Sequence, residues 1–276
     1  MGSKKGVKKR PTTERDRLYR LVLGLREDGL SYNQIIERVE VETGVTLRKS
    51  HISGWINGKH RPLGYVRAFD ASPCAELAYV IGVSLGDAST SSSPSNYNHK
   101  IKLRVIDEEF AQEFARCLGV LLGRTPPRVK WHEKTHSWHT ELSSLLLMRF
   151  LRRDLVVLVP LIEHCPRCMG AFLRGFYDSE ASIRGRQLRV HNGDLDKLKL
   201  VCRLLSSLGI ETTGPHLRGE KGGTGSIKGK LYHVNKDQYY VYVRTSSLLA
   251  FSYSVGFTIV RKQERLKEAV MVRGRG

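Results

Sequence analysis

The sequence predicts an α+β fold in which a small all-α segment precedes two halves that resemble one another. Three observations support this prediction. A short stretch occurs twice, at residues 77–89 and 170–182, and both copies align without a gap. Apolar residues recur at helical spacing through residues 13–62, and short segments of alternating apolar and polar residues follow each copy of the repeated stretch. The chain is therefore expected to contain one helical domain and a duplicated mixed domain.

The repeated stretch has small residues at positions i, i+4 and i+8, which form one narrow stripe on a helix. These residues are Ala78, Gly82 and Gly86 in the first copy and Ala171, Gly175 and Ser179 in the second. A glycine inside a helix costs ~1 kcal/mol relative to alanine, so a compensating contact is expected. A stripe of small residues lets two helices cross at or below the usual spacing of ~8–10 Å. We therefore predict that the two repeated helices pack directly against each other.

An acidic residue follows the last small residue of each stripe, Asp87 in the first copy and Glu180 in the second. If the helices cross along the stripes, the two carboxylates lie close together. Their repulsion raises one pKa unless a cation is bound, and carboxylates are suitable ligands for Mg²⁺. The alternative is that both acids only cap helix ends, but an acid at a helix C-terminus interacts unfavourably with the helix dipole.

This double motif resembles that of the LAGLIDADG homing endonucleases, in the single-chain form with two motif copies, and the resemblance covers about the C-terminal three quarters of the chain. The resemblance implies two tandem pseudo-symmetric αββαββα domains whose open sheet faces form a saddle for DNA. It also implies metal-dependent hydrolysis of both strands at a long asymmetric site, by a monomer whose gene lies in an intron or an intein. The cofactor would be Mg²⁺ or another divalent cation, with Ca²⁺ as a non-cleaving substitute.

The resemblance extends to further site residues. In the family a polar residue at the end of the second strand of each half assists the metal-bound waters, and the matching positions are Asp107 and Asn192. The family usually has an amide there, so Asp107 departs from the pattern. A basic residue near the start of the last helix stabilises the transition state, and Arg261 or Lys262 matches it. In the first half the counterpart considered is Lys130. The residues after the two acids, Ala88 and Ala181, are implied as further metal ligands.

Residues 13–62 are expected to form three short helices, and the second of these begins with a capping box at Ser31 to Gln34. The last two helices around a glycine-containing turn match a helix-turn-helix, whose exposed candidates for DNA contact are Arg48, Lys49 and His51. A plain three-helix packing domain is the alternative. The expected segments are a basic flexible arm at 1–12, this domain at 13–62, a linker at 63–72, and the two LAGLIDADG domains at 73–164 and 165–276. The arm is either a solvated tail or a DNA contact.

Two local features are expected around the first repeated stretch. Ser72 followed by Pro73 is typical of a helix start, so the first repeated helix is expected to begin there. The polar stretch at 89–94, after Asp87, is expected to be a turn.

Basic and aromatic residues on the expected strands and loops are further candidates for DNA contact. One predicted strand alternates Ile101, Leu103 and Val105 with basic residues, as expected for a strand that lines a groove. A hairpin over 128–141, a mobile basic loop over 219–230 and two expected strands at 187–190 and 239–243 provide the others. The candidates are Lys100, Lys102, Arg104, Arg128, Lys130, His132, Arg189, Lys228, Lys230, Tyr240 and Tyr242.

The composition favours a polyanion as partner. Among 276 residues, 46 Lys and Arg outnumber 27 Asp and Glu, which gives a net charge of +19. No apolar run reaches the ~18–20 residues of a membrane span, and no signal peptide is visible, so no membrane contact is expected. The odd number of cysteines, five, favours a reducing compartment. We expect an intracellular protein of the cytoplasm or nucleoid, with an organelle or a nucleus left open.

Two other patterns indicate metals only weakly. Residues 132–136 formally match the HExxH motif of zinc proteases, but the surrounding alternation favours a hairpin over the required helix. His164, Cys165 and Cys168 form half of a zinc site, with no second pair at a zinc-like spacing. The alternatives to an endonuclease are a non-catalytic DNA-binding regulator of the same fold, an RNA maturase that binds intron RNA and, least favoured, a protease.

Overall fold

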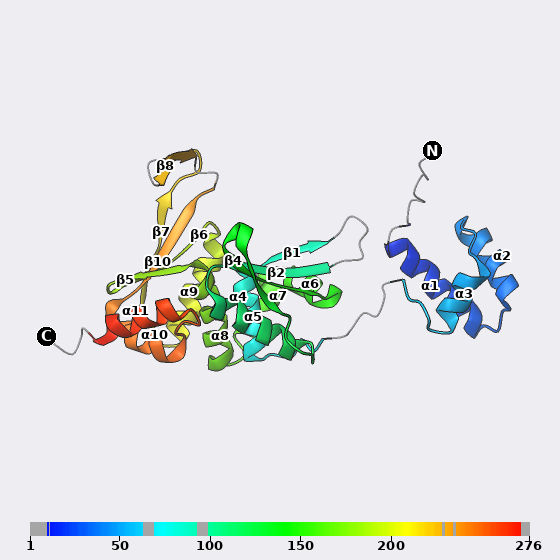
Figure 1. Ribbon diagram of the computed structural model, residues 1–276, viewed down its shortest axis with the longest axis horizontal. Coiled ribbons are helices and arrows are strands. Elements are labelled where there is room, and N and C mark those ends of the chain that lie inside the picture. The colour runs from blue at the N-terminus through cyan, green and yellow to red at the C-terminus, as the bar shows by residue number, and fades with distance from the viewer. Residues whose placement is uncertain are drawn as a thin grey trace. The chain divides into compact units, whose positions relative to one another are not determined.

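The computed structural model describes residues 10, 12–62, 69–92, 99–227, 230–233 and 236–271. These residues fall into two compact units. One unit holds the three N-terminal helices, and the other holds both repeated helices and nearly all of two four-stranded sheets (Figure 1). The two expected LAGLIDADG domains thus lie within one compact unit. None of the described helices combines the length and apolarity that crossing a bilayer requires.

The N-terminal unit contains α1 (Thr12–Glu27), α2 (Tyr32–Thr43) and α3 (Lys49–Ile56). The predicted capping box is present, because the backbone N–H of Ser31 bonds Gln34 Oε1 at 2.9 Å and the Ser31 hydroxyl accepts from Gln34 N. The buried core of these helices consists of Leu18, Val22, Ile35, Val39, Leu47, Ile52 and Trp55. Apolar burial on one side of each helix therefore accounts for this unit.

The repeated stretches form α4 (Ala75–Leu85) and α8 (Pro166–Glu180), which pack against each other along the predicted stripes. A Cβ added to Gly82 would collide with the carbonyl oxygen of Phe172, and one added to Gly175 would lie 2.5 Å from the carbonyl oxygen of Tyr79. The helix backbones are thus in direct contact, with no side chain between them at these positions. The prediction of a close helix crossing is confirmed.

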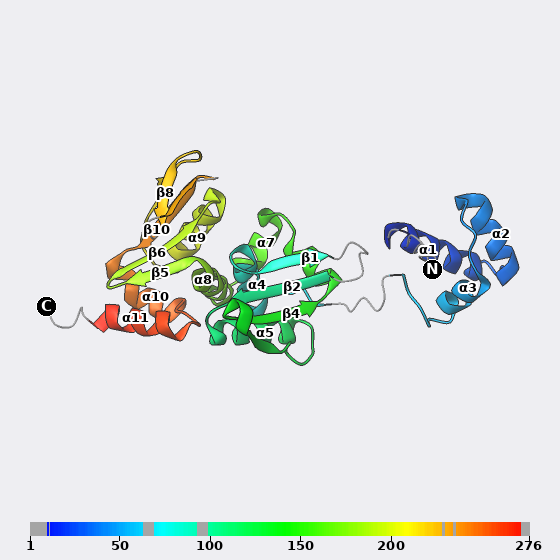
Figure 2. The ribbon, with the colours of Figure 1, turned by 45° about the horizontal axis from the view of Figure 1, so that its top comes forward.

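The rest of the first half forms a sheet with the strand order β1-β2-β4-β3. Its elements are β1 (Ser89–Ser92), β2 (His99–Val105), α5 (Glu108–Leu121), β3 (Val129–His132), β4 (Ser137–Ser143), α6 (Leu145–Leu151) and α7 (Leu155–Ile162). Figure 2 shows β1, β2 and β4 side by side. Ile101 and Leu103 are buried on one face of β2, as the alternation predicts.

The second half repeats this arrangement with the strand order β5-β6-β10-β7. Its elements are β5 (Ala181–Arg184), β6 (Gln187–Asn192), α9 (Leu195–Ser207), β7 (Thr212–Gly219), β8 (Thr224–Ile227), β9 (Lys230–His233), β10 (Gln238–Val243), α10 (Leu248–Ser254) and α11 (Val260–Met271). The β5–β6, β6–β10 and β10–β7 pairs are antiparallel, and α9 packs on this sheet. The matching strand orders confirm the two similar αββαββα halves.

Three local predictions are wrong. The first repeated helix does not begin at Ser72, because Asp70 accepts bonds from the Ser72 backbone at 2.8 Å and its hydroxyl at 2.6 Å. Cys74 is the N-cap instead. The polar stretch after Asp87 was expected to be a turn but forms β1, because pairing with β2 overrides its low strand propensity. Part of the expected loop over 219–230 forms β8, which pairs with β9.

Candidate active site

The two motif acids stand where the paired helices end. Glu180 is the last residue of α8, and Asp87 follows Gly86, the C-cap of α4. The pKa of Glu180 is raised to about 7, first by loss of hydration and then by the negative charge of Asp87. Loss of hydration also raises the pKa of Asp87, and the positive charge of Lys262 offsets part of this rise. The two carboxylates are therefore close enough to interact.

Asn192 holds Glu180 in place. It is the last residue of β6, and its Nδ2 donates to Glu180 Oε1 at 3.1 Å. Its Oδ1 accepts from the backbone N–H of Asp194 at 2.9 Å, which fixes the amide orientation. The bond to Asn192 lowers the pKa of Glu180 and so partly offsets the effect of Asp87. The structure thus brings together this pair of predicted site residues.

Two lysines bind the carbonyl groups at the ends of the paired helices. Lys262 Nζ donates to Asp178 O at 2.6 Å and to Tyr177 O at 3.2 Å, at the end of α8. Lys197 Nζ donates to Leu85 O at 2.9 Å, at the end of α4. A cation at a helix C-terminus is favourable to the helix dipole. Both paired helices therefore end on an ammonium group, and both lysines belong to the second half of the chain.

Lys262 acts on both acids. It is buried, and burial is the main reason that its pKa is lowered to about 8. Its charge lowers the pKa of Asp87 and of Glu180. Lys197 also lowers the pKa of Glu180, and it was missed at the sequence level. Its only sequence signal is a lysine in the first turn after the Asp194 cap, and nothing local indicates that it reaches α4.

Arg261 makes a different contact from Lys262. Its Nε and Nη2 donate to the two Asp107 carboxylate oxygens at 2.6 and 2.7 Å, a two-pronged ion pair. Two of the predicted site residues thus pair with each other. Next to the acids, the backbone N–H of Ala88 donates to Val83 O, and that of Ala181 donates to Tyr177 O. These bonds fix the backbone after each acid.

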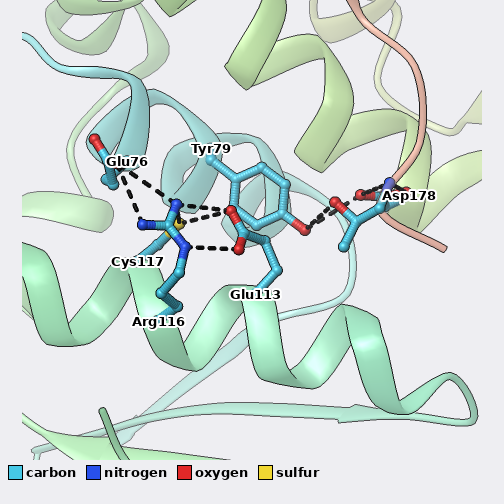
Figure 3. A network of polar contacts seen from close by, with 7 residues as sticks. Glu76, Tyr79, Glu113, Arg116, Cys117 and Asp178 are labelled. Carbon is cyan, nitrogen blue, oxygen red and sulfur yellow. Dashed lines mark hydrogen bonds and ion pairs between the residues drawn. The ribbon is translucent and has the colours of Figure 1, made fainter. Parts of the chain in front are cut away.

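Polar contacts connect α4, α5 and α8, the helices that support the acids (Figure 3). The Tyr79 hydroxyl of α4 lies 3.2 Å from Oδ2 of the buried Asp178 of α8. Oδ1 of Asp178 accepts from the backbone N–H of Thr258 at 3.0 Å, just before α11. Burial raises the pKa of Asp178 to about 6. On α5, Arg116 Nε donates to Glu113 at 2.7 Å, and its guanidinium also reaches Glu76 of α4. The helices that carry the acids are therefore cross-linked by polar contacts.

The face of the second sheet away from the helices carries basic and aromatic residues. Val241 and Val243 of β10 are buried, whereas Tyr240 and Tyr242 alternate with them and form an edge-to-face pair at 5.3 Å. His191 and Arg189 alternate in the same way on β6. The pKa of His191 is lowered to about 4, first by burial and then by the neighbouring Arg189 and Arg218. Three candidates for DNA contact, Arg189, Tyr240 and Tyr242, thus lie together on this face. His191 lies beside Tyr240 and was not among the candidates.

The corresponding face of the first sheet is also basic. Lys130 pairs with His139 across the β3–β4 ladder, and His132 stacks on His139 at 3.9 Å. The Lys102 ammonium lies 3.9 Å from the Glu141 carboxylate on β4. Residues 132–136 form the end of β3 and a 3₁₀ turn, so the HExxH match lacks its helix and the expected hairpin is confirmed.

The remaining candidates for DNA contact are placed as follows. Lys100 and Arg104 lie on β2, and Arg128 is exposed just before β3. Arg48, Lys49 and His51 are exposed at the start of α3. Lys230 begins β9, and Lys228 lies outside the described residues.

Comparisons with known proteins agree with this fold. A family model described as a LAGLIDADG-like domain matches residues 167–256. An uncharacterised protein of Methanocaldococcus jannaschii, MJ0398, is 33% identical over 254 residues, which cover 91% of this chain and 92% of that protein. A second protein of that organism, MJ0314, is 27% identical over 188 residues, covering 64% of this chain and 68% of that protein.

Among solved structures, the homing endonuclease I-DmoI in complex with DNA and Ca aligns with a TM-score of 0.52 at 17% identity, covering 70% of this chain and 97% of that chain. I-DmoI in complex with DNA and Mn aligns with a TM-score of 0.50 at 19% identity, covering 66% and 96%. The fold and the two motif acids define a LAGLIDADG protein. The chain belongs to the LAGLIDADG homing endonuclease family, in the form that carries two motif copies.

Proposed function

We propose that this protein is a site-specific endonuclease that hydrolyses both strands of double-stranded DNA with a divalent cation. The observation that carries the proposal is the pair of carboxylates at the adjoining ends of α4 and α8, where the charge of Asp87 raises the pKa of Glu180. Two like charges held together raise the pKa of one carboxyl group, and a bound cation relieves this repulsion. All-oxygen donors such as these suit Mg²⁺ or Mn²⁺ rather than a softer metal.

The residues around the acids have distinct roles in this proposal. A divalent cation supplies an activated water and neutralises charge on the departing oxygen of the phosphodiester. Asp87 and Glu180 hold the cation, with the carbonyl groups of Ala88 and Ala181 as neighbouring oxygen donors. Asn192 fixes the orientation of Glu180 through its 3.1 Å bond. Lys262 offsets the negative charge of both acids from the buried side.

Asp107 and Arg261 have a less direct role. They neutralise each other in a bidentate ion pair, so neither carries an uncompensated charge next to the acids. We propose that this pair positions the start of α11, which carries Lys262, against the start of α5. The 2.8 Å bond from the Val260 backbone N–H to Glu109 supports the same contact.

The DNA would lie along the open faces of the two sheets. These faces carry Lys102, Lys130 and Arg189 together with the aromatic residues Tyr240 and Tyr242. The net charge of +19 favours binding to phosphates. The exposed residues Arg48, Lys49 and His51 at the start of α3 would add a helix-turn-helix contact. The I-DmoI structures contain DNA with Mn or Ca, which supports a DNA substrate and a divalent cation. We further propose that the protein acts as a monomer and is encoded by an intron or an intein.

The test is a cleavage assay on supercoiled plasmids that carry the joined sequences flanking the coding element. With Mg²⁺, the wild-type protein should produce linear DNA with staggered ends, and with Ca²⁺ it should bind without cleaving. Asp87→Ala and Glu180→Ala should each abolish double-strand cleavage while DNA affinity changes within about threefold, because the acids contact the cation rather than the bases. The exposed residue Glu264 provides a matched control, and Glu264→Ala should cleave normally.

The outcomes separate the alternatives. Cleavage that persists in both single variants would refute the assignment of the acids. Tight specific binding without cleavage under any divalent cation would favour a DNA-binding regulator. Binding of intron RNA and support of splicing by both acid variants would favour a maturase.

A further inference from the structure

Two cysteines and a histidine lie at the opposite end of α8 from the candidate active site. One ring nitrogen of His164 and the sulfur atoms of Cys165 and Cys168 all lie within 4.8 Å of one another. Cys165 is the N-cap of α8 and Cys168 lies in its first turn, whereas Glu180 ends the helix. At a rise of about 1.5 Å per residue, the two ends of the helix are ~20 Å apart. The cluster is therefore separate from the acids.

The spacing of the two cysteines on the helix fits a disulfide. Residues three apart on a helix have Cα atoms ~5 Å apart, and disulfide-bonded cysteines have Cα atoms about 4.4–6.8 Å apart. The two sulfur atoms lie within 4.8 Å of each other, and the backbone N–H of Cys168 donates to Sγ of Cys165 at 3.4 Å. Rotation of the two side chains is therefore sufficient to bring the sulfur atoms to the ~2.0 Å of a bond, and the helix backbone can stay in place.

The two thiols differ in their exposure to solvent. Cys165 is half-buried, and the two residues between the cysteines, Pro166 and Arg167, are exposed and line a cavity of about 440 Å³. The Cys168 side chain is only 2% exposed. A small molecule can thus reach the sulfur of Cys165 but not that of Cys168, whereas the Cys168 sulfur is within reach of Cys165.

The surroundings of Cys165 are those of a nucleophilic cysteine. Thiolates are stabilised at helix N-termini, beside an imidazole and in Cys-x-x-Cys sequences. Cys165 combines all three features, since it caps α8, lies next to the His164 ring and is followed three residues later by Cys168. A structural zinc site would need four protein donors, and the cluster supplies three among the residues that the structure describes. The arrangement therefore favours thiol chemistry over a structural metal.

We propose that Cys165 and Cys168 form a redox-active dithiol that a low-molecular-weight disulfide converts reversibly to an intramolecular disulfide. In the first step the Cys165 thiolate attacks one sulfur of that disulfide, a mixed disulfide forms at Cys165, and one thiolate leaves. In the second step Cys168 gives its proton to the imidazole of His164, the Cys168 sulfur attacks that of Cys165, and the second thiolate leaves. Two protein thiols are thereby oxidised, and one small disulfide is reduced to two thiols, which take up the two protons that the cysteines lose.

The test uses the full-length protein, which is reduced with dithiothreitol, separated from it and then treated with excess oxidised glutathione. Free thiols are alkylated under denaturing conditions, and peptide mass spectrometry identifies the state of each cysteine. Cys165 and Cys168 should be joined to each other within one chain. Renewed treatment with dithiothreitol should restore both thiols, because the exchange is reversible.

Three variants test the order of the two steps. Cys168→Ser should stop at the mixed disulfide, with one glutathione on Cys165, because the thiol that completes the reaction is absent. In Cys165→Ser, glutathione should modify Cys168 at least ~10-fold more slowly than it modifies Cys165 in Cys168→Ser, because the Cys168 sulfur is buried. Cys202→Ser is the matched control, because Cys202 is half-buried on α9 outside the cluster, and it should form the disulfide as fast as the wild type.

The measurement on the wild-type protein decides the proposal even if a variant folds poorly. Both thiols still free after treatment with oxidised glutathione, or glutathione retained on Cys165 without a disulfide, would overturn it. So would a stoichiometric amount of zinc in protein purified without a chelator, because a bound metal would occupy the same sulfur atoms. None of these results depends on DNA cleavage, so the endonuclease proposal is tested separately.

Discussion

Replacing Glu180 by glutamine should make the metal-free protein more stable at neutral and alkaline pH. The pKa of Glu180 rises from an ordinary value of 4.5 to about 7, so the folded state holds its proton more tightly than the unfolded state. Between these two values the folded protein binds more protons, and its stability falls as the pH rises. Glutamine has nearly the same shape, can still accept the bond from Asn192, and has no charge to desolvate.

The magnitude follows from the size of the shift. At ~1.4 kcal/mol per pKa unit, the rise from 4.5 to about 7 corresponds to ~3 kcal/mol above pH 7. Residual solvent contact at this partly buried side chain makes this an upper value. Below pH 4.5 the wild-type side chain is protonated in both states, so the variant gains nothing there. The gain should therefore appear between pH 4.5 and 7 and remain constant above that range.

The assay is urea unfolding of the wild-type and Glu180→Gln proteins at several pH values, in a chelating buffer. The exposed residue Glu264 provides the control, and Glu264→Gln should differ from the wild type by less than ~0.5 kcal/mol at every pH. Adding Mg²⁺ should stabilise the wild type and not Glu180→Gln. A stability difference between the two proteins that is the same at pH 4.5 and pH 8 would show that the folded state does not raise the pKa of Glu180. The inference that burial and Asp87 disfavour its charged form would then be wrong.

Three further results are expected. Gly175→Ala should destabilise the protein by ~1–3 kcal/mol, because its Cβ would lie 2.5 Å from the Tyr79 carbonyl oxygen. Gly24→Ala, with no atom within 4 Å of the new Cβ, should stabilise it by up to ~1 kcal/mol. Urea unfolding checks both variants, and a stabilised Gly175→Ala would contradict the close crossing. Tyr79→Phe should lower the free energy of unfolding by ~1–3 kcal/mol, measured in the same way, because it removes a hydroxyl that donates to the buried Asp178. An unchanged free energy of unfolding would mean that this contact does not stabilise the protein. The Mg²⁺ concentration for half-maximal cleavage should rise about fivefold from pH 7 to pH 6, because one proton competes with the cation at Glu180, whose pKa of about 7 lies at the upper end of this range. A flat profile would argue against that carboxylate as a ligand.

Local sequence patterns were sufficient for the central elements. The stripes of small residues predicted the helix crossing, because only a direct backbone contact explains glycine in the middle of two helices. The alternation at Ile101 and Leu103 predicted β2 and its buried face. The closeness of Asp87 and Glu180 followed from the crossing, since each acid comes directly after its stripe.

Contacts between distant segments could not be predicted in this way. Lys197 reaches the Leu85 carbonyl group across 112 residues of sequence, and no periodicity signals such a bond. The ion pair between Asp107 and Arg261 joins the two halves and was equally hidden, although each residue had been considered by itself. The start of α4 was misplaced because Ser72 has the chemistry of a cap, but Asp70 competes for it within the same short segment.

The direct backbone contact between α4 and α8 also bears on how such proteins can be recombined. Because main-chain atoms meet at Gly82 and Gly175, the separation of the two acids is set by the backbone and does not depend on the volume of core side chains. Under the proposed endonuclease function, halves taken from different relatives should keep the same distance between the two cutting positions on DNA, provided that each donor retains its glycine. Divergence elsewhere in the core would then alter stability without altering the length of the proposed overhang.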